Sequence, residues 1–546
     1  MKKTMRILAL ILAMAMVMGC VSVASAAEKK GKIRLVLVDN SNVPLSQGDV
    51  ENNRWTNWVK ENAPVEIEYI VIPAAQRDET LMNLFAAGDG PDYFSHGNDP
   101  GVYIQNDLIM EITDEMLEKV PNYVKQIEMH PFLNKVNFVN GARLGFGGYE
   151  PVRQNHTFTV RGDWMDNLGI SAPTTVDELF DMIYAFTYND PDGNGVDDTW
   201  GTTMTTDGQR IYAHMFGFPN PEKYTIDKDN NLSYAWDNAE AWLTFVKKVV
   251  DAGCVNPDFV TMKADDDMAD FLNGRVGIWA SGRPSTARGV EYYHTFKELN
   301  PDGYWTSFSL PETEFGQFTP YIQGGGGLAN YISADCENVD AVLEYVNWRN
   351  DPATFAYLNF GPEGEYYQKD EYGTYRQVCS NEKLAEEFSW SPFISVGGIY
   401  ETYEEEQANM LYNIYLTSED PITREFGELY YLECQVANEP DVPDPRRWQQ
   451  NLPTLPTDLN VLKGTLNNEV NGILNGAIGN KDITAAEAIA QAKDTWIKGG
   501  GEKVDQYYAD FYKSADEHVY TMWDYNTAKV MPILTPAAAE NITKAE

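Results

Sequence analysis

Cysteine is scarce in this chain, which has five among its 546 residues, and four of these follow the first 20 positions. The four are widely separated, form no Cys-x-x-Cys pair and have no histidine at zinc-ligand spacing: Cys254, Cys336, Cys379 and Cys434. The sequence therefore predicts no zinc site built from Cys and His. Disulfide pairing is open to an exported chain, but buried free thiols are the simpler expectation.

Basic residues are few as well. Lys and Arg together number 41 against 82 Asp and Glu, so the formal net charge is −41. This field repels nucleic-acid phosphates and anionic lipids, and we expect no nucleic acid as a partner. It also disfavours anionic ligands, except where a local Arg153, Arg161 or Arg283 lines the site.

Long apolar runs occur only at the start of the chain. Basic residues within the first six positions precede an apolar stretch over residues 7–19, and this pattern identifies residues 1–26 as a signal peptide. Two processing sites stay open, because VMGC ending at Cys20 resembles a lipobox whose cysteine is lipidated, whereas ASA ending at Ala26 resembles a signal-peptidase site. Either site predicts an exported protein, held as a lipoprotein at the outer face of the cytoplasmic membrane or secreted. No later run is long and apolar enough to span a membrane.

Catalytic motifs are also missing. The sequence contains no Gly-x-Ser-x-Gly, no His-Glu-x-x-His and no Gly-x-x-x-x-Gly-Lys-[Ser/Thr], the signatures of α/β-hydrolases, zinc proteases and P-loop proteins. Carboxylate pairs that could hydrolyse a glycosidic bond are abundant, but they would be abundant in any chain this acidic. We therefore expect no enzyme activity, and a secreted carbohydrate-active enzyme stays the alternative.

One acidic segment has a metal-binding pattern. Residues 190–201 read DPDGNGVDDTWG, which places oxygen donors at alternate positions and Gly195 at the sixth, where an EF-hand-type calcium loop turns sharply. The predicted calcium ligands are Asp190, Asp192, Asn194, the Val196 carbonyl and Asp198. Gly201 stands at position twelve in place of a bidentate Glu, so at least one ligand must come from elsewhere or from water. An acidic surface turn that binds no ion is the alternative.

The first part of the chain alternates between strand and helix patterns. Residues 33–38, 65–71 and 92–94 are typical of strands, and residues 50–62 and 78–87 of helices. This order predicts an α/β fold, with a mostly parallel sheet covered by helices on both faces.

A second unit follows with the same mixture of elements. Thr175 and Glu178 have the spacing of a capping box, and the helix that they open leads into the calcium-type loop. Residues 271–279 indicate a helix end, a turn and a buried strand, and the remainder is mainly helical, most clearly over 485–496 and 503–512.

Five segments in this order resemble one known family. They are residues 81–92 (LMNLFAAGDGPD), 161–173 (RGDWMDNLGISAP), 271–279 (FLNGRVGIW), 359–366 (NFGPEGEY) and 498–507 (KGGGEKVDQY). Over residues 30–515 the chain resembles the extracellular solute-binding proteins (family 1) of ABC sugar importers, of the large oligosaccharide-binding lipoprotein type. The resemblance implies an oligosaccharide ligand, ABC permease subunits in the membrane as partners, and a structural calcium away from the ligand. Thr199 stands at loop position ten, where that family commonly has an acidic residue.

The resemblance also implies a two-lobed fold of the periplasmic-binding-protein type (type II), with a helical C-terminal part and a ligand cleft at the hinge. We expect lobe 1 to comprise residues 31–150 and 312–350, and lobe 2 residues 151–311 and 351–515. Residues 516–546 form a C-terminal extension whose role the sequence does not indicate. A monomer is expected.

Sugars present C–H faces to aromatic rings and hydroxyls to planar polar groups. Ligands of doubly wound sheets lie beyond the carboxyl ends of the strands, which favours Asn40, Ser41, His96, Asp99, Trp279 and Arg283. Further candidates in predicted loops are Trp305, Glu363, Tyr366 and Trp390. Trp279 is the first choice for a stacking ring, although each Trp taken alone is more simply a core residue. A calcium-dependent adaptor would need two calcium loops, whereas residues 227–231 lack the glycine and indicate a hairpin turn.

Overall fold

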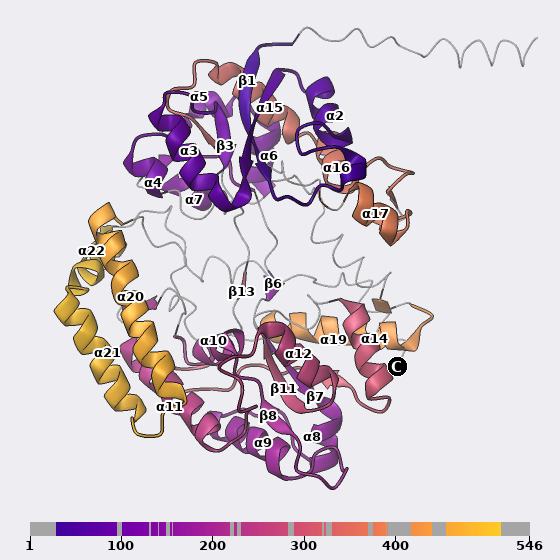
Figure 1. The fold of residues 1–546 in the computed structure, drawn as a ribbon, viewed down its shortest axis with the longest axis vertical. Coiled ribbons are helices and arrows are strands. Elements are labelled where there is room, and N and C mark those ends of the chain that lie inside the picture. The colour runs from indigo at the N-terminus through magenta and orange to yellow at the C-terminus, as the bar shows by residue number, and fades with distance from the viewer. Residues whose placement is uncertain are drawn as a thin grey trace, which may run out of the picture.

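The computed structural model describes residues 29–95, 101–129, 133–139, 141–148, 153–154, 157–218, 223–226, 231–281, 289–318, 322–323, 330–369, 375–388, 390, 415–416, 418–438 and 455–514. They form two α/β units, one above the other in Figure 1, with a group of C-terminal helices beside the second. This confirms the predicted α/β fold with two lobes.

The first unit is built on a four-stranded sheet in the order β14-β3-β1-β2. β1 (Lys32–Asp39) runs parallel to β2 (Glu66–Pro73) and to β3 (Tyr93–Ser95), whereas β14 (Asn330–Ile332) returns antiparallel to β3. The three strands predicted near the N-terminus are therefore present and parallel. The returning strand comes from more than two hundred positions later, so the chain leaves this unit and comes back to it.

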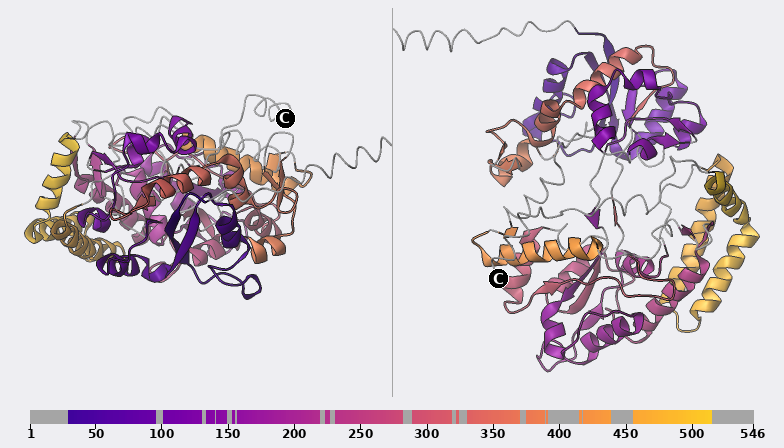
Figure 2. Two further views of the ribbon diagram at one scale, coloured as in Figure 1. Left: turned by 90° about the horizontal axis from the view of Figure 1, so that it is seen from above. Right: turned by 180° about the vertical axis from the view of Figure 1, so that it is seen from behind.

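Helices cover both faces of this sheet (Figures 1 and 2). Alternate residues of β1 point to opposite faces, so Leu35 packs in one hydrophobic cluster and Val36 in another. The helical segments of the unit are η1 (Leu45–Gln47), α2 (Arg54–Asn62), η2 (Ala74–Gln76), α3 (Arg77–Ala86), α4 (Gly101–Gln105), α5 (Asp114–Leu117), α6 (Pro121–Met129), α7 (Leu133–Val136), α15 (Val339–Arg349), α16 (Pro352–Phe360) and α17 (Asn381–Glu387). Two small hairpins complete it, β4 (Phe138–Val139) with β5 (Ala142–Arg143) and β15 (Tyr367–Lys369) with β16 (Tyr375–Gln377).

The second unit has its own four-stranded sheet in the order β12-β7-β11-β8. β11 (Val276–Ser281) lies antiparallel to β7 (Thr157–Arg161) and parallel to β8 (Trp200–Thr202), and β12 (Trp305–Thr306) is antiparallel to β7. The hairpin of this unit is formed by β9 (Tyr224–Ile226) and β10 (Leu232–Tyr234). Its helices are α8 (Gly162–Leu168), α9 (Val176–Tyr188), α10 (Thr206–Met215), α11 (Trp236–Asp251), α12 (Ala264–Leu272) and α14 (Val290–Leu299).

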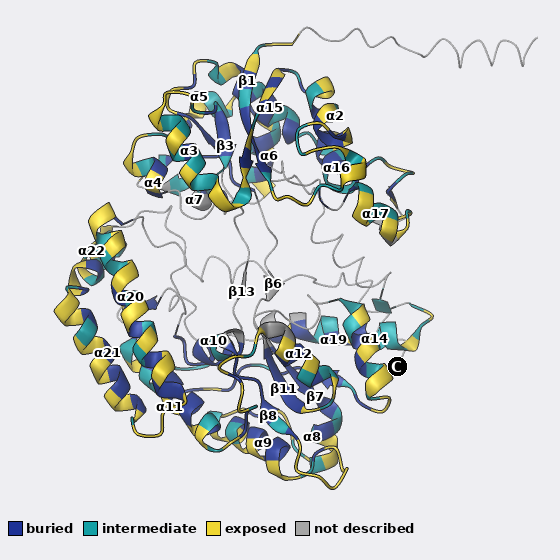
Figure 3. Ribbon diagram, viewed as in Figure 1, coloured by how far each residue is buried: buried dark blue, intermediate teal, exposed yellow. Residues whose placement is uncertain are grey.

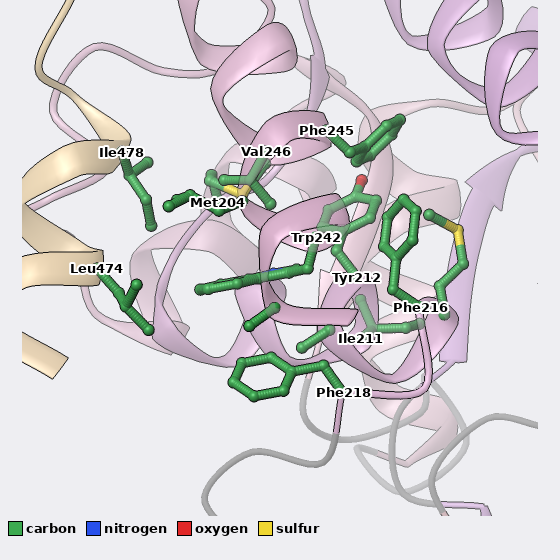
Figure 4. Packing of buried hydrophobic residues seen from close by; sticks show 14 of the residues in the cluster. Met204, Ile211, Tyr212, Phe216, Phe218, Trp242, Phe245, Val246, Leu474 and Ile478 are labelled. Atoms are coloured by element: carbon green, nitrogen blue, oxygen red, sulfur yellow. The ribbon is translucent and has the colours of Figure 1, made fainter. Parts of the chain in front are cut away.

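The C-terminal helices belong to the core of the second unit. They are α19 (Pro421–Asn438), α20 (Thr457–Ile478), α21 (Ala485–Gly499) and α22 (Glu502–Ser514). Leu474 and Ile478 of α20 face Trp242 and Val246 of α11 within one hydrophobic cluster (Figure 4). The buried Lys247 donates to the carbonyls of Ala477 and Asn480 at 2.8 and 2.7 Å, so a cation satisfies the carboxyl end of α20.

Two short crossing strands pair between the units. β6 (Arg153–Gln154) lies antiparallel to β13 (Ile322–Gln323), and Figures 1 and 2 place this pair between the two sheets. Each crossing strand lies between an element of the first unit and one of the second in chain order. The pair is therefore where a change in the angle between the units would be absorbed.

The segment after α15 packs on the first unit. Trp55 of α2 meets Tyr366 at 5.6 Å and Phe388 at 4.9 Å between ring centroids, and its indole nitrogen donates to the Glu387 carbonyl at 2.7 Å. The expected division had residues 351–515 in lobe 2, whereas Tyr366, Glu387 and Phe388 make these contacts with lobe 1. Rings separated by some three hundred positions pair here, which local sequence patterns do not encode.

Candidate functional site

The carboxyl ends of β1 and β11, one strand from each sheet, lie on the inner side of the two units, toward the crossing strands. β1 runs from the outer end of the first unit toward the second (Figure 1), so Asn40 and Ser41, which follow it, lie on the inner side. In the second unit Ser281, the last residue of β11, pairs with Thr157, the first residue of β7. Because β7 begins three positions after the crossing strand β6, this end of β11 is also the inner end. The ends of β1 and β11 thus lie on the inner side of the two units, and a ligand site there stays a prediction.

Asn40 and Ser41 are exposed side chains on a tightly turned backbone. Ser41 has a φ of 56°, and its backbone N–H donates to the Asp39 carboxylate at 2.7 Å. A left-handed serine is strained, and the Asp39 hydrogen bond holds it in place. Both polar side chains are thus presented from a fixed turn. His96, Asp99 and Arg283 lie outside the described residues.

Buried threonines that follow β8 bond to neighbouring elements of the second unit. The Thr203 hydroxyl accepts from the Ala280 N–H and lies 3.0 Å from the Ala280 carbonyl, to which it donates. Thr205 donates to the buried Asp267 carboxylate. These bonds tie β8, α12 and β11 together directly behind Ser281, which stiffens the lobe at the place where a ligand would press on it.

Two of the predicted rings, Trp279 and Trp305, are packed in the interior. Trp279 is 1% exposed and lies 6.1 Å from the Phe271 ring, and Trp305 is 4% exposed and lies 4.9 Å from both Tyr293 and Phe296. Both belong to one hydrophobic cluster of the second unit. Their burial favours the core interpretation, and a stacking role for either stays a prediction.

Tyr366 and Trp390 are also buried, in the first unit. They share a cluster with Trp55 and Phe388, and the Trp390 indole donates to the Glu386 carbonyl at 2.9 Å. The structure therefore brings these two together with each other but not with Trp279 or Trp305. A ligand contact by either ring stays a prediction.

Glu363 is exposed, and its neighbour Glu365 has a defined structural function. Arg54 grips the Glu365 carboxylate with two hydrogen bonds, at 2.8 and 2.7 Å, and Lys383 adds a third at 3.1 Å. The Arg54 bonds lower the pKa of Glu365 to about 2. This carboxylate clamps α2 to the segment around α17, an arrangement that the sequence analysis missed because its partners are far apart in the chain.

The predicted calcium loop has the backbone of an ion-binding turn. Asp190, Gly193 and Gly195 all have positive φ. Three side-chain oxygens accept from backbone N–H groups farther along the loop: Asp190 from Gly195 at 3.1 Å, Asp192 from Asn194 at 3.3 Å, and Asn194 from Val196 at 2.7 Å. Each predicted side-chain donor at positions one, three and five is thus held by the loop itself, with its remaining lone pairs free to coordinate.

The carboxylates of this loop are close enough to affect one another. Asn194 donates its side-chain N–H groups to both Asp192 and Asp198, at 2.8 and 3.3 Å. Partial burial and the neighbouring Asp198 and Asp190 charges raise the pKa of Asp192. A divalent cation would relieve this repulsion, so the donor set fits calcium. Within the described ranges, however, no group of three or more His, Cys, Asp or Glu side chains has converged into a metal site.

In the part of the chain that the structure describes, neither the cysteine thiols nor a membrane-spanning helix provides a further candidate site. Cys254, Cys336 and Cys379 are free cysteines, and burial raises the pKa of Cys254 and raises that of Cys336 to about 12. The Cys434 side chain lies outside the described ones. Among the helices that the structure describes, none combines the length and apolar character needed to cross a membrane.

Comparison with known proteins gives three curated relatives. The chain is 23% identical over 341 residues to the polygalacturonan/rhamnogalacturonan-binding protein YtcQ of Bacillus subtilis, covering 58% of this chain and 64% of the relative. It is 25% identical to lipoprotein LipO of the same organism, covering 41% and 46%. It is 19% identical to the fructooligosaccharide ABC transporter substrate-binding protein FusA of Streptococcus pneumoniae, covering 60% and 63%. The chain thus spans less than two thirds of each relative. No family model matches.

Solved structures show the same fold over nearly the whole chain. An extracellular solute-binding protein from Bifidobacterium longum subsp. infantis matches with a TM-score of 0.67 at 16% identity, covering 90% of this chain and 99% of that one. An EF-hand mutant of FusA from S. pneumoniae, in complex with fructo-nystose, matches at 0.61 and 14% identity, covering 88% and 99%. The alginate-binding protein AlgQ2 without calcium ion matches at 0.59 and 14% identity, covering 90% and 99%. Relatives and neighbours thus include ABC-transporter substrate-binding proteins for sugars, which confirms the resemblance seen in the motifs.

Proposed function

We propose that this protein, a relative of ABC-transporter substrate-binding proteins for sugars, captures an oligosaccharide outside the cytoplasmic membrane and delivers it to the permease subunits of an importer. The observation that supports this most is the presence of two α/β units in which the carboxyl ends of β1 and β11 lie toward the crossing strands β6 and β13. A ligand that touches both ends is bound more tightly when the units approach, so its binding energy drives closure.

The proposed contacts come from both units. Asn40 and Ser41 offer amide and hydroxyl groups from the first unit, and the end of β11 at Ser281 is the corresponding edge of the second. His96, Asp99, Trp279, Arg283, Trp305, Glu363, Tyr366 and Trp390 remain proposed ligand residues on sequence grounds. Exposed, rigidly turned polar side chains suit hydroxyl recognition, because they need no reordering when the sugar arrives.

The net charge of −41 favours a neutral sugar over a uronic one. The relatives leave both open, because one is named for polygalacturonan and rhamnogalacturonan and another for fructooligosaccharide. Thermal unfolding with a panel of neutral and acidic oligosaccharides would decide, since tight binding to the folded state raises the melting temperature. A protein that no oligosaccharide stabilises would contradict the proposal.

A secreted carbohydrate-active enzyme is the second candidate. Its only support is the abundance of carboxylates, whereas the relatives are named as binding proteins. Incubation of each stabilising sugar with the purified protein, followed by product analysis, separates the two: unchanged sugar agrees with a binding protein, and turnover with an enzyme.

The loop over residues 190–198 is proposed to hold a structural calcium. Asp190, Asp192, Asn194, the Val196 carbonyl and Asp198 would supply the oxygens, and the ion would fix the end of α9 against β8. Two structural neighbours, an EF-hand mutant of FusA and the alginate-binding protein AlgQ2 without calcium ion, support the idea. Metal analysis of the purified protein should find one calcium per chain, and a chelator should lower the melting temperature. Absence of calcium together with indifference to chelator would contradict it.

Export and anchoring complete the proposal. The protein would act as a monomer at the outer face of the membrane, anchored through Cys20 or released by cleavage after Ala26. Mass spectrometry of the mature N-terminus distinguishes a diacylglyceryl-cysteine from a free residue 27.

A further inference from the structure

The outer face of α9 carries a row of three aromatic rings, Phe180, Tyr184 and Tyr188, which we call the α9 strip. Ring centroids are 6.2 Å apart between Phe180 and Tyr184 and 4.7 Å apart between Tyr184 and Tyr188. Tyr184 and Tyr188 are 45% and 44% exposed. Spacing of four residues puts the three on one face of the helix, over about 12 Å at 1.5 Å per residue. Two large exposed rings in contact form an apolar surface that packing inside this chain does not explain.

Neighbouring polar groups hold the strip in position. The Tyr188 hydroxyl donates to the Ala252 carbonyl at 2.7 Å, and the Lys248 ammonium lies 3.9 Å from the centroid of the Phe180 ring. Lys248 also pairs with Asp177 at 3.4 Å. Both ends of the strip are therefore fixed before any ligand arrives, which lowers the entropy lost on binding.

A groove of about 740 Å³ opens at the Phe180 end of the strip. Asp177 and Lys248 line it and connect it to the strip, and its floor includes the buried rings of Phe216 and Phe245. Four carboxylates are among its lining groups: Asp177, Asp237, Glu240 and Glu314. Carboxylates accept hydrogen bonds from hydroxyl groups and repel anions, so strip and groove together suit an uncharged, hydroxyl-rich chain with apolar C–H faces.

The α9 strip lies away from the crossing strands, whereas the groove extends to Phe216 after α10 and to Glu314 and Phe315, a few positions before β13. α9 is at the end of the second unit that points away from the first (Figure 1), and Figure 3 shows exposed residues along its outer side. A ligand on the strip therefore cannot bridge the two sheet ends. A second copy of this chain is a poor occupant, because each molecule carries a net charge of −41 and the groove is acidic.

We propose that the α9 strip and its groove form a second glycan-binding surface, which holds a neutral polysaccharide chain outside the hinge site. This inference goes beyond capture of an oligosaccharide for import and does not depend on it, because the strip would bind polymer even if the hinge site took another ligand. Its effect would be to keep the protein beside the polymer from which oligosaccharides are released.

Affinity electrophoresis of the full chain through native gels that contain dextran, galactan or polygalacturonate tests the proposal. At least one neutral polymer should retard the protein, and polygalacturonate should not. Tyr184→Ala should weaken the retardation roughly tenfold in apparent affinity, as loss of a stacking ring does, and Tyr184→Phe should retain it. Val461→Ala removes an exposed apolar side chain from α20 and is the matched control, with retardation unchanged.

The same variants separate this surface from the hinge site. The melting-temperature increase produced by a short hinge ligand should be equal in Tyr184→Ala and the unchanged protein. If no short ligand raises the melting temperature but a neutral polymer still retards the protein, the hinge proposal is contradicted and the strip proposal stands. Equal retardation of Tyr184→Ala and the unchanged protein would overturn the strip proposal. Dimerisation of the unchanged protein in sedimentation, abolished by Tyr184→Ala, would also overturn it, because a second copy of the chain would then occupy the strip.

Discussion

Ligand stacking and core packing require different environments for the Trp279 ring. Stacking on a sugar requires an open ring face, whereas this ring is 1% exposed and shares a cluster with Phe271 and Trp305. The strand around it was predictable, because residues 276–281 form an apolar run after a turn. The direction of one side chain depends on which strands flank β11, namely β7 and β8, and that pairing is not encoded locally.

Trp279→Ala is expected to lower the free energy of unfolding by about 3–5 kcal/mol, because it leaves a cavity in a packed cluster. Oligosaccharide affinity per folded molecule decides between the two roles, because it stays unchanged for a core residue and falls if the ring also stacks on the sugar. Urea denaturation and calorimetric binding measure the two quantities, and Tyr184→Ala, which removes an exposed ring, should cost far less stability. Normal stability with lost affinity would instead identify Trp279 as a ligand-stacking ring.

The Glu365 carboxyl makes the stability of the fold depend on pH in the acid range. Hydrogen bonds from Arg54 lower its pKa from 4.5 to about 2, against the opposing effect of burial. A depressed carboxyl pKa stabilises the fold above the unfolded-state value, and this contribution is lost as the pH falls from 4.5 toward 2. Because the Glu365 side chain is 35% exposed, solvent screens part of the effect.

Glu365→Gln should therefore weaken the protein at neutral pH and flatten its stability profile between about pH 5 and pH 2. Denaturation with urea at several pH values measures this profile. Glu363→Gln, which changes an exposed carboxyl two positions away, is the matched control and should leave the slope as it is. An equal slope for Glu365→Gln and the unchanged protein would show that the clamp is not formed in solution.

At the scale of elements, features that depend on neighbouring residues were predicted from the sequence, whereas contacts between distant residues were not. The capping box at the start of α9 was predictable, and the Thr175 hydroxyl does accept from the Glu178 N–H at 3.3 Å while the Glu178 carboxylate accepts from the Thr175 N–H at 3.2 Å. Both partners lie within four positions, so sequence spacing determines their geometry. Arg54 and Glu365 are 311 positions apart, and nothing in either neighbourhood predicts that they meet.

Asp192→Ala should abolish calcium binding, because it removes the donor at loop position three. The melting temperature without calcium should stay the same or rise slightly, since Asp192 is destabilised as a charge by burial and by Asp198 and Asp190. The increase caused by calcium should disappear, while oligosaccharide affinity is retained. Differential scanning calorimetry with calcium and with chelator measures both.

Asp197→Ala is the matched control for this loop. It removes a carboxylate of the same loop that lies outside the predicted ligand set, so the calcium-dependent increase should persist. If Asp197→Ala and Asp192→Ala behaved alike, general acidity rather than the alternating donors would hold the ion.

At the scale of the whole molecule, the order of motifs predicted the two-lobed α/β fold, and solved neighbours share it over about nine tenths of the chain. The choice of the carboxyl ends of β1 and β11 as candidate positions followed from a general rule for doubly wound sheets, whereas the facing of two lobes was implied by the family resemblance. The ligand identity did not follow, because affinity for one sugar depends on a few side chains in loops between elements, and the candidates His96, Asp99 and Arg283 lie outside the described residues. Of the properties that bear on ligand choice, only the net charge can be read directly from the sequence.

A charge of −41 makes salt a test of ligand class. At low ionic strength the field extends about 30 Å and repels an anionic oligosaccharide, whereas at about 1 M salt it is screened within about 3 Å. Affinity for a uronic oligosaccharide should therefore rise with salt, while affinity for a neutral one of equal length should not change. Isothermal titration calorimetry at about 10 mM and about 500 mM sodium chloride gives both constants. If uronic affinity falls with salt instead, local cations such as Arg153 or Arg283 outweigh the global field, and the ligand is an acidic glycan held by ion pairs.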